Sequence, residues 1–354
     1  MKGHSRPRLY SDVNLAKPSS DLDYSALALT WGKQESYEIL RKLGRGKYSD
    51  VYEGLEVATS KKVVIKILKP IRKSKVLREV KILKTLEHVQ GVPRLLDIVK
   101  DNSTKTPSLI MDHSENQDFL ALFKELDELD AKFYLWEILR VLDQANANGI
   151  MHRDIKPSNI LVDHSKRSLQ VIDWGLAEFY LPGKQLNCRV ASRYYKAPEL
   201  LMGYEKYDYS VDMWSFGTLL GAVIFRKNPF FHGHDNYDQL VKTVRTLGTA
   251  PFHEYLEKYN MPLDERYEDL RHNYNTKSWN KFMNSETKLA TPEALDLLSK
   301  VLVYDHEARL LPSEAMQHVY FLQVRELLDK VASATVVPGG SDTFSILVRR
   351  KLGN

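Results

Sequence analysis

Two short polar motifs, residues 152–159 and 173–175, carry the strongest chemical signal in the sequence. The apolar stretches 160–163 and 169–172 lie between them and predict a β-hairpin that pairs residue 160 with 172 and residue 163 with 169. This register sets Asn159 opposite Asp173, about 5 Å away across the strands. An amide and a carboxylate at that separation can share hard cations such as Mg²⁺, so we predict both side chains as metal ligands.

Asp154 and Lys156 lie within the first of these motifs. The carboxylate of Asp154 can accept the proton of a substrate hydroxyl, while Lys156 supplies positive charge to a group in transfer. Taken singly, Asp154 also fits a turn residue, and Asn159 also fits the cap of a strand. The joint spacing makes a coincidence improbable, so we interpret the set as catalytic.

A glycine-containing segment, residues 44–51, lies between two strand candidates. Gly44 and Gly46 allow a tight turn that brings backbone N–H groups against phosphate oxygens. Taken alone, the segment favours an ordinary hairpin. A dinucleotide-binding fingerprint fits less well, because a strand rather than a helix follows.

Lys66 interrupts the apolar strand candidate 63–68. A lysine with apolar neighbours on both sides either extends its ammonium to solvent or requires a counter-charge. Glu79 is the only acidic residue between Lys61 and Lys84, and it lies on a helix candidate. We therefore predict that Glu79 pairs with Lys66 and holds the ammonium toward a phosphate group.

The elements that position these residues form a small β-rich unit followed by a larger helical one. Strand candidates at 40–43, 51–57, 63–68, 95–99 and 109–111 accompany one helix at 75–86. Beyond residue 115 helical patterns dominate, and one stripe ends at Gly149; it consists of Ala131, Leu135, Ile138, Leu142 and Ala145. The predicted fold class is α+β, with a small lobe at 37–113 and a large lobe at 114–330. Residues 1–36 are expected to pack on this core, and 331–354 to form a C-terminal tail.

The composition is that of a globular protein, since 43% of the 354 residues are hydrophobic and 27% are charged. The single cysteine, Cys188, excludes an intramolecular disulfide and favours a reducing compartment. No apolar stretch follows the basic N-terminus, so no secretory signal is predicted. The longest uncharged run, residues 213–225, is shorter than the ~20 residues of a membrane span and predicts a buried helix.

In chain order, these motifs resemble the signature set of eukaryotic protein kinases, which includes Ala197-Pro198-Glu199 at the end of the activation segment. The resemblance spans about residues 37 to 325. It is closer still to the catalytic alpha subunits of casein kinase II, on the residues Ser49 and Trp174 and the segments 10–14, 190–194 and 228–240. The sequence is therefore identified as a member of this kinase family, and a bilobal protein kinase fold is expected.

The resemblance implies a serine/threonine kinase that uses ATP, with GTP as an alternative donor, together with Mg²⁺. It implies Asp154 and Lys156 as catalytic residues, and Asn159 and Asp173 as the Mg²⁺ ligands. Asp212 is implied to brace the catalytic loop, and Glu199 and Arg309 to form an internal ion pair. The implied nucleotide site consists of Gly44, Arg45, Gly46, Lys47, Ser49, Val51, Val64, Lys66, Glu79, Asp112, His113, Ser114, Asp118 and Asn159.

A basic cluster is expected to select the substrate. Residues 61–84 hold ten basic residues and one acidic residue, a net charge of +9 in a chain whose total is +5. Such a run is commonly a solvated face, and nucleic-acid or polyanion contact is an alternative reading. Beside a kinase cleft it favours recognition of acidic residues that follow the target Ser or Thr. The residues predicted to contact substrate are Lys47, Arg72, Lys73, Lys75, Arg189, Arg193 and Lys196.

The segment between Asp173 and Glu199 bears on how activity is controlled. Its hydroxyl side chains are Tyr180, Ser192, Tyr194 and Tyr195. Residues 181–191 therefore offer no Ser or Thr where many kinases are switched on by phosphorylation. We predict constitutive activity, with the N-terminal segment packed against this loop.

Partners and location are expectations from the resemblance. It implies a heterotetramer with a regulatory beta subunit dimer, docked near Ile39 and Tyr52, in the cytoplasm and nucleus and without a membrane partner. The hinge, residues 111–114, and Ser158 depart from the usual pattern of the family. These departures leave the use of GTP and the strictness of substrate selection open.

Two other classes of function are weighed against this one. A pseudokinase scaffold would hold partners without chemistry, although all the residues of the catalytic set are present. A basic nucleic-acid-binding module would use residues 61–84, but no recognisable binding motif accompanies them, so nucleic acid is not the expected partner.

Overall fold

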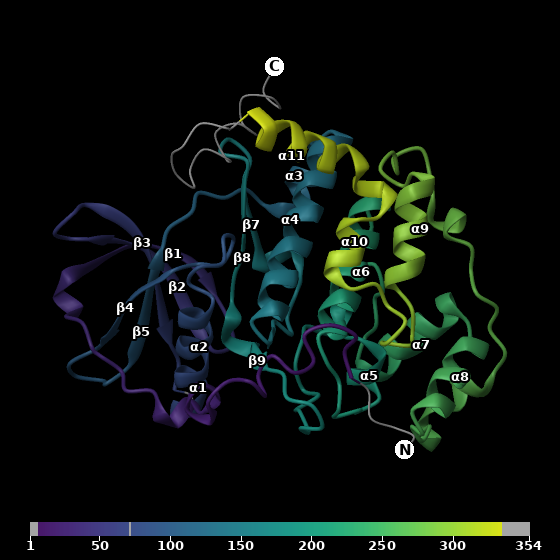
Figure 1. Ribbon diagram of the computed structural model, residues 1–354, viewed down its shortest axis with the longest axis horizontal. Helices are drawn as coiled ribbons and strands as arrows, with labels where there is room; N and C mark the ends of the chain where they lie inside the picture. The colour runs from purple at the N-terminus through teal and green to yellow at the C-terminus, as the bar shows by residue number, and fades with distance from the viewer. Residues whose placement is uncertain (1–5, 71, 335–354) are drawn as a thin grey trace.

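The computed structural model describes residues 6–70 and 72–334, which form two lobes joined by the chain that follows β5 (Figure 1). The small lobe contains a five-stranded antiparallel sheet, and the large lobe is mainly helical. The predicted α+β, two-lobed fold is confirmed. Residues 335–354 of the predicted tail lie outside the described residues, and its predicted start at 331 falls inside helix α11.

The sheet of the small lobe has the strand order β1-β2-β3-β5-β4. Alternation along β3 separates two faces, because successive side chains of a strand point in opposite directions. Val63 and Ile65 pack with Val99 and Ile110 on the outer face. Leu68 packs with the main core on the side of helix α2. The strands are β1 (Tyr37–Arg45), β2 (Ser49–Glu56), β3 (Lys61–Leu68), β4 (Leu95–Lys100) and β5 (Pro107–Asp112).

Helix α2 (Lys73–Thr85) lies against this inner face. Val76, Val80 and Leu83 recur at helical spacing and are buried, so they form the packed side of the helix. Each such side chain stabilises the lobe by about 1.5–3 kcal/mol. Glu79 is also buried and therefore faces the interior of the molecule.

The large lobe is built around α4 and α6, which are buried along most of their length. The side chain of Asp127 caps α4 by accepting from Asp130 N, and the helix ends before Gly149, whose φ is +77°. Helix α6 contains nearly all of the uncharged run 213–225 and confirms the predicted buried helix. The helices are α3 (Phe119–Glu125), α4 (Glu128–Ala147), α5 (Pro198–Leu201), α6 (Ser210–Ile224), α7 (Asn236–Leu247), α8 (Ala250–Lys258), α9 (Pro292–Val301), α10 (Pro312–Met316) and α11 (Leu322–Ala334).

Within the described ranges, the structure contains no helix with both the length and the apolar character needed to cross a membrane.

Two short sheets belong to the large lobe and pack near α4. Strand β6 (Ile150–Met151) pairs with β9 (Glu178–Phe179), and β7 (Ile160–Asp163) pairs with β8 (Ser168–Val171). The predicted hairpin exists, but its register was wrong by one residue, since residue 160 pairs with 171 and residue 163 with 168. The turn explains the difference: Asp163 Oδ1 accepts from Lys166 N at 3.0 Å, and Arg167 takes a left-handed φ of 50°, which closes a four-residue loop.

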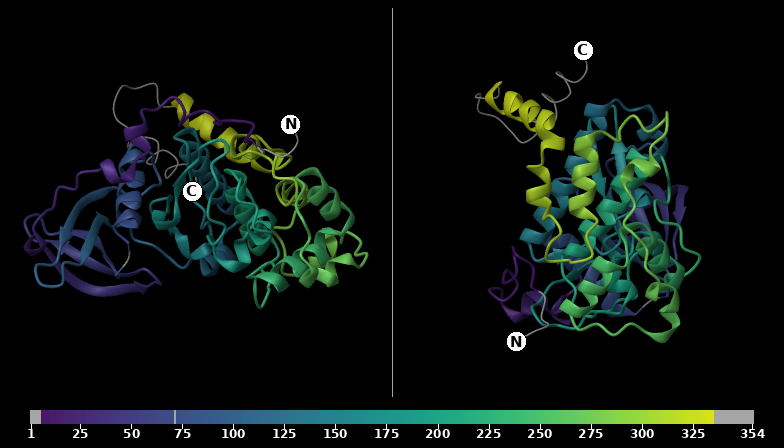
Figure 2. Two further views of the ribbon diagram at one scale, coloured as in Figure 1. Left: turned by 90° about the horizontal axis from the view of Figure 1, so that it is seen from below. Right: turned by 90° about the vertical axis from the view of Figure 1, so that its right-hand side faces the viewer.

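The described part of the N-terminal segment, residues 6–36, runs along both lobes (Figure 2). At its start Arg8 donates to Glu314 Oε2 at 2.7 Å, and at its end Gly32 N donates to Ile98 O, on β4, at 2.9 Å. Between these points Asn14 Nδ2 donates to the carbonyls of Gly149 and Tyr180. This segment contains the short helix α1 (Ser19–Leu22).

Candidate active site

Lys66 lies in the central strand β3, opposite Val51 of β2 and Leu109 of β5. Its buried ammonium donates to Glu79 Oε1 at 2.6 Å and to Asp173 Oδ1 at 2.7 Å. Burial opposes the charged form of Lys66, but the two carboxylates outweigh it, so the pKa lies above its ordinary value. The predicted pairing of Lys66 with Glu79 is confirmed, and Asp173 joins the pair from the large lobe.

The loop that carries Asp154 is held by the buried carboxylate of Asp212. The backbone N–H groups of His152 and Arg153 donate to Asp212 Oδ2 and Oδ1, each at 2.7 Å. These bonds fix Arg153 in a left-handed conformation with φ 66°. Because Asp212 lies on α6, the core of the large lobe sets the position of the loop. The bracing contact implied for Asp212 is present.

Asp154 forms a compact polar cluster with Lys156 and Ser192. Asp154 Oδ2 accepts from Lys156 Nζ at 2.7 Å, and Oδ1 accepts from the N and Oγ of Ser192 at 2.8 and 2.9 Å. Lys156 Nζ also donates to Ser192 Oγ at 3.0 Å. A hydroxyl group therefore lies within reach of both proposed catalytic side chains. Ser192 was missed from sequence because it lies 38 residues from Asp154 and belongs to no motif with it.

Asn159 and Asp173 are not cross-strand neighbours, in contrast to the predicted register. Ile172 N donates to Asn159 O at 2.9 Å, so Ile172, and not Asp173, is the cross-strand neighbour. Asp173 follows with a left-handed φ of 62° and turns its carboxylate toward Lys66. Burial opposes ionisation of Asp173, but the charge and hydrogen bond of Lys66 prevail and lower the pKa of this carboxyl.

The oxygen donors of these two residues suit a hard divalent cation. Asn159 donates Nδ2 to Asp154 O at 2.9 Å, which leaves the amide oxygen as a donor to a metal, and the Asp173 side chain is 47% exposed. Across the residues that the structure describes, no group of three or more His, Cys, Asp and Glu side chains could hold a metal ion. Two oxygen donors fit Mg²⁺, whose other positions are commonly filled by water and substrate phosphates.

A cavity of ≈310 Å³ separates the Gly-rich loop from the Asp154 cluster. Gly46 N closes the loop by donating to Ser49 O at 2.8 Å, and Lys69 Nζ donates to Gly46 O at 2.5 Å. A Cβ atom on Gly44 would meet nothing within 4 Å, so its neighbours leave room for close approach to the backbone. The predicted site residues in the cavity lining are Gly46, Lys47, Ser49, Lys66, Lys75, Glu79, Asp154, Lys156, Asp173 and Arg189.

The other residues of the implied nucleotide site are not part of this cavity lining. Gly44, Arg45, Val51 and Val64 belong to β1, β2 and β3, Asp112 ends β5, and His113 and Ser114 follow it. Asp118 caps α3 by accepting from Ala121 N at 2.7 Å, and it lines a second cavity of ≈400 Å³ together with Lys156 and Ser158. Asn159 is buried beneath the Asp154 loop.

A family model described as the protein kinase domain matches residues 37–321, which include the sheet, α2 and most of the large lobe. The chain belongs to the protein kinase family. Protein kinases transfer a phosphoryl group from ATP to protein and use a divalent metal ion. The cavity between Lys66 and Asp154 is therefore the place where this chemistry is expected in the kinase.

The basic residues predicted to contact substrate fall into two groups in the kinase. Lys47, Arg72, Lys73 and Arg189 are exposed, and Lys75 is partly exposed at the start of α2. The other group is engaged in the protein: Arg193 donates to His234 O, and the buried Lys196 donates to Val190 O. Burial lowers the pKa of Lys196. The first group is available to a substrate, as is the exposed remainder of the Arg193 guanidinium, whereas the buried Lys196 is not.

Arg153 and the activation segment of the kinase are held by internal contacts. Arg153 Nη1 donates to Tyr207 Oη and Nε to Leu176 O, both at 2.8 Å, and the side chain is almost fully buried. Arg78 of α2 contacts Glu178 at 3.2 Å, and Tyr24 of the N-terminal segment donates to the same carboxylate. The predicted packing of the N-terminal segment against this loop is confirmed.

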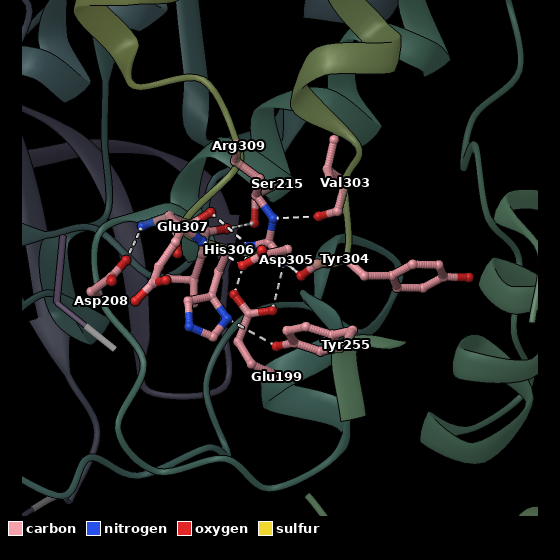
Figure 3. Close-up of polar contacts among 12 residues, drawn as sticks. Glu199, Asp208, Ser215, Tyr255, Val303, Tyr304, Asp305, His306, Glu307 and Arg309 are labelled. Carbon is pink, nitrogen blue, oxygen red and sulfur yellow. Dashed lines mark hydrogen bonds and ion pairs between the residues drawn. The ribbon is translucent and has the colours of Figure 1, made fainter. Parts of the chain in front are cut away.

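The ion pair between Arg309 and Glu199 lies in the core of the large lobe (Figure 3). Arg309 Nη1 and Nη2 donate to the two Glu199 oxygens at 2.6 and 2.8 Å. Burial opposes ionisation of Glu199, but the guanidinium outweighs it and lowers the pKa of the carboxyl. The remaining N–H groups of Arg309 donate to backbone carbonyls of Val303, Tyr304 and Ser210. The implied pair is present and is enclosed by protein.

Proposed function

We propose that this kinase phosphorylates Ser or Thr residues that are followed by acidic residues, and that it is a catalytic subunit of the casein kinase II alpha type. The observation that carries the proposal is the placement of Lys47, Lys75 and Arg189 around the same cavity as Asp154. These ammonium and guanidinium groups would meet the carboxylates of a substrate whose hydroxyl lies at Asp154.

The roles of the residues follow from the contacts of the cavity. Asp154 accepts the proton of the substrate hydroxyl while the oxygen of that hydroxyl forms a bond to the γ-phosphorus. The bond between the γ-phosphorus and the oxygen of ADP breaks, and ADP leaves with the electrons of this bond. Lys156, already 2.7 Å from Asp154, offers positive charge to the phosphoryl oxygens. Lys66 binds the phosphates of the nucleotide, and Glu79 holds its ammonium in place. Asn159 and Asp173 would hold Mg²⁺, which neutralises phosphate charge when bound.

Constitutive activity is part of the proposal. In kinases switched by phosphorylation, a new phosphate orders the activation loop by pairing with arginine. Here Arg153 already donates to Tyr207 and Leu176, and Glu178 already holds Arg78 and Tyr24. The segment is therefore ordered by side chains that need no modification.

The nucleotide and partner choices are further parts of the proposal. We take ATP as the donor and retain GTP only as an alternative, because the hinge, residues 111–114, departs from the usual pattern of the family. A regulatory beta subunit dimer is proposed to dock on the outer face of the small lobe, where Ile39 is 53% exposed. Co-elution of the kinase with a beta subunit would test that surface, and we expect an Ile39→Glu variant to lose it.

One assay tests the activity. Unphosphorylated enzyme from bacteria should transfer radiolabel from ATP with Mg²⁺ to an acidic serine peptide far faster than to a matched neutral peptide. The Asp154→Ala variant should lose about 10²–10⁴-fold in rate, the usual contribution of a general base. Lys73→Glu combined with Lys75→Glu should weaken use of the acidic peptide without a comparable loss of ATP binding.

The alternatives give different results in the same assay. If the wild-type protein transfers no phosphate, the result would support a pseudokinase scaffold. Strong binding of a nucleic-acid duplex without phosphate transfer would support a nucleic-acid-binding module. Equal rates on acidic and neutral peptides would exclude the proposed selectivity. Activity that appears only after treatment by another kinase would exclude constitutive function.

A further inference from the structure

Tyr48 lies at the tip of the Gly-rich loop, between two lysines that are predicted to bind substrate. Lys75 Nζ lies 4.6 Å from the centroid of the Tyr48 ring, and Lys47 Nζ lies 5.4 Å from it. Both distances are within the ~6 Å reach of a cation–π interaction. One aromatic ring therefore contacts two ammonium groups that come from different elements.

Hydrogen bonds from Lys69 hold the backbone that carries the ring. Tyr48 O accepts from Lys69 N at 2.9 Å, and Lys69 Nζ donates to Gly46 O on the other side of the turn. Lys75 lies in the first turn of α2, four residues before Glu79, which pairs with Lys66. The ring and both lysines line the ≈310 Å³ cavity that also contains Asp154.

The two lysines have no carboxylate partner to hold them. In the part of the chain that the structure describes, neither Lys47 nor Lys75 takes part in an ion pair, and the first turn of α2 contains no acidic residue. The charge of Lys75, in the first turn of α2, is unfavourable next to the positive end of the helix dipole, and it repels the like charge of Lys47 on the Gly-rich loop. The electron-rich face of the Tyr48 ring is therefore the group that offsets this repulsion.

We propose that Tyr48 is a positioning residue that gathers Lys47 and Lys75 into one receptor for substrate carboxylates. This inference rests on the proposed acidic selectivity and adds a residue to it. An ammonium already held against a ring loses less freedom when a carboxylate binds, so the ring increases affinity for acidic substrates without touching them. In this role the face of the Tyr48 ring contacts the two ammonium groups, and the hydroxyl group is not required.

The measured quantity is the ratio of kcat/KM for an acidic peptide to kcat/KM for a matched neutral peptide. This ratio cancels effects on folding, on nucleotide binding and on the transfer step. Tyr48→Leu should lower the ratio about fivefold, the scale of a cation–π contact at an exposed site. Tyr48→Phe should keep the wild-type ratio, because it retains the ring.

A second set of variants separates Lys75 from its neighbour Lys73, which is exposed and, among the described residues, lies over no aromatic ring. Tyr48→Leu and Lys75→Met should be non-additive, since either change removes the same contact. Tyr48→Leu and Lys73→Met should be additive. Melting temperatures within a few degrees of wild type would confirm that the variants fold.

The possible results have distinct meanings. An unchanged ratio in Tyr48→Leu, an equal loss in Tyr48→Phe, or additivity with Lys75→Met would each overturn the role of the ring while leaving the proposed selectivity intact. A wild-type ratio near one, seen before any variant is made, would overturn the selectivity and this inference together.

Discussion

Lys66 and Arg309 both form buried ion pairs, but the two pairs differ in what they leave free. Arg309 and Glu199 have no exposed side-chain surface. The N–H groups of the guanidinium donate to Glu199 and to three backbone carbonyls. Lys66 and Glu79 lie in a cavity wall, and Asp173, which completes their cluster, is 47% exposed. The first pair is closed by protein, and the second is open to a ligand.

The comparison shows that a shifted pKa does not by itself identify a functional group. The carboxyls of Glu199 and Asp173 both have a lowered pKa, and in both a neighbouring cation outweighs the opposing effect of burial. The two carboxylates differ in exposure: the Asp173 side chain remains 47% exposed beside Lys66, whereas Glu199 beside Arg309 has no exposed surface. We therefore assign the closed pair to stability and the open cluster to chemistry.

The largest expected effect is the loss of the closed pair. Arg309→Met should destabilise the kinase by about 3–5 kcal/mol, because Glu199 would be left charged and uncompensated in the core. Chemical denaturation with a global probe would measure this. A double variant that also carries Glu199→Leu should recover part of the loss. A loss below about 1 kcal/mol in Arg309→Met would mean that the pair is not structural.

A substitution in the open cluster should lower the catalytic activity more than the stability. Lys66→Met should lower the rate of phosphoryl transfer about 10²–10³-fold, as is typical when one preorganised electrostatic contact is removed. Its effect on unfolding should be smaller than that of Arg309→Met, because Glu79 and Asp173, the two carboxylates that lose their partner, both line the cavity, where water can solvate them. The comparison fails if Lys66→Met keeps its specific activity, or if it destabilises the kinase as much as Arg309→Met does.

A smaller effect should come from His306, which lies beside the closed pair. Its ring is buried, Nδ1 lies 3.0 Å from Tyr255 Oη, and Nε2 has no hydrogen-bond partner within the described structure. Burial lowers the pKa of His306, although the charge of Glu199 partly opposes this. The folded pKa is therefore below the unfolded value of about 6.5.

The sign of the pH effect follows from that order of pKa values. Between the folded pKa and about 6.5 the unfolded chain binds more protons, so stability falls as the pH is lowered through this window. The loss is at most about 1.4 kcal/mol per pH unit for one group. Melting temperatures at pH 7.5 and 5.5 should differ more in wild type than in His306→Phe. Equal differences would exclude His306 as the source.

The elements of the small lobe could be predicted from sequence because each is specified locally. The strand patterns and the helix expected at 75–86 correspond to β1 to β5 and α2 (Lys73–Thr85). The Lys66–Glu79 contact was also predictable, since one lysine in an apolar strand had a single acidic residue within reach. In these cases the deciding interactions come from residues close in the chain.

Three features of the site depend on contacts that the sequence pattern does not contain. The hairpin register was set by the Asp163 side chain and by Arg167, and the predicted register differed by one residue. Ser192 reaches Asp154 only through tertiary folding. Lys196 has the same charge as Arg189, but its neighbours bury it, and nothing in the local sequence distinguishes the two.

The N-terminal segment fixes points on both lobes, and this limits how the molecule can move. Arg8 is attached to Glu314 and Asn14 to Gly149 in the large lobe, while Gly32 is attached to Ile98 in the small lobe. A chain of fixed length between such anchors acts as a tether, because a wide rotation of one lobe away from the other would require one anchor to detach. A segment that lies outside the kinase domain itself thus restrains interlobe motion.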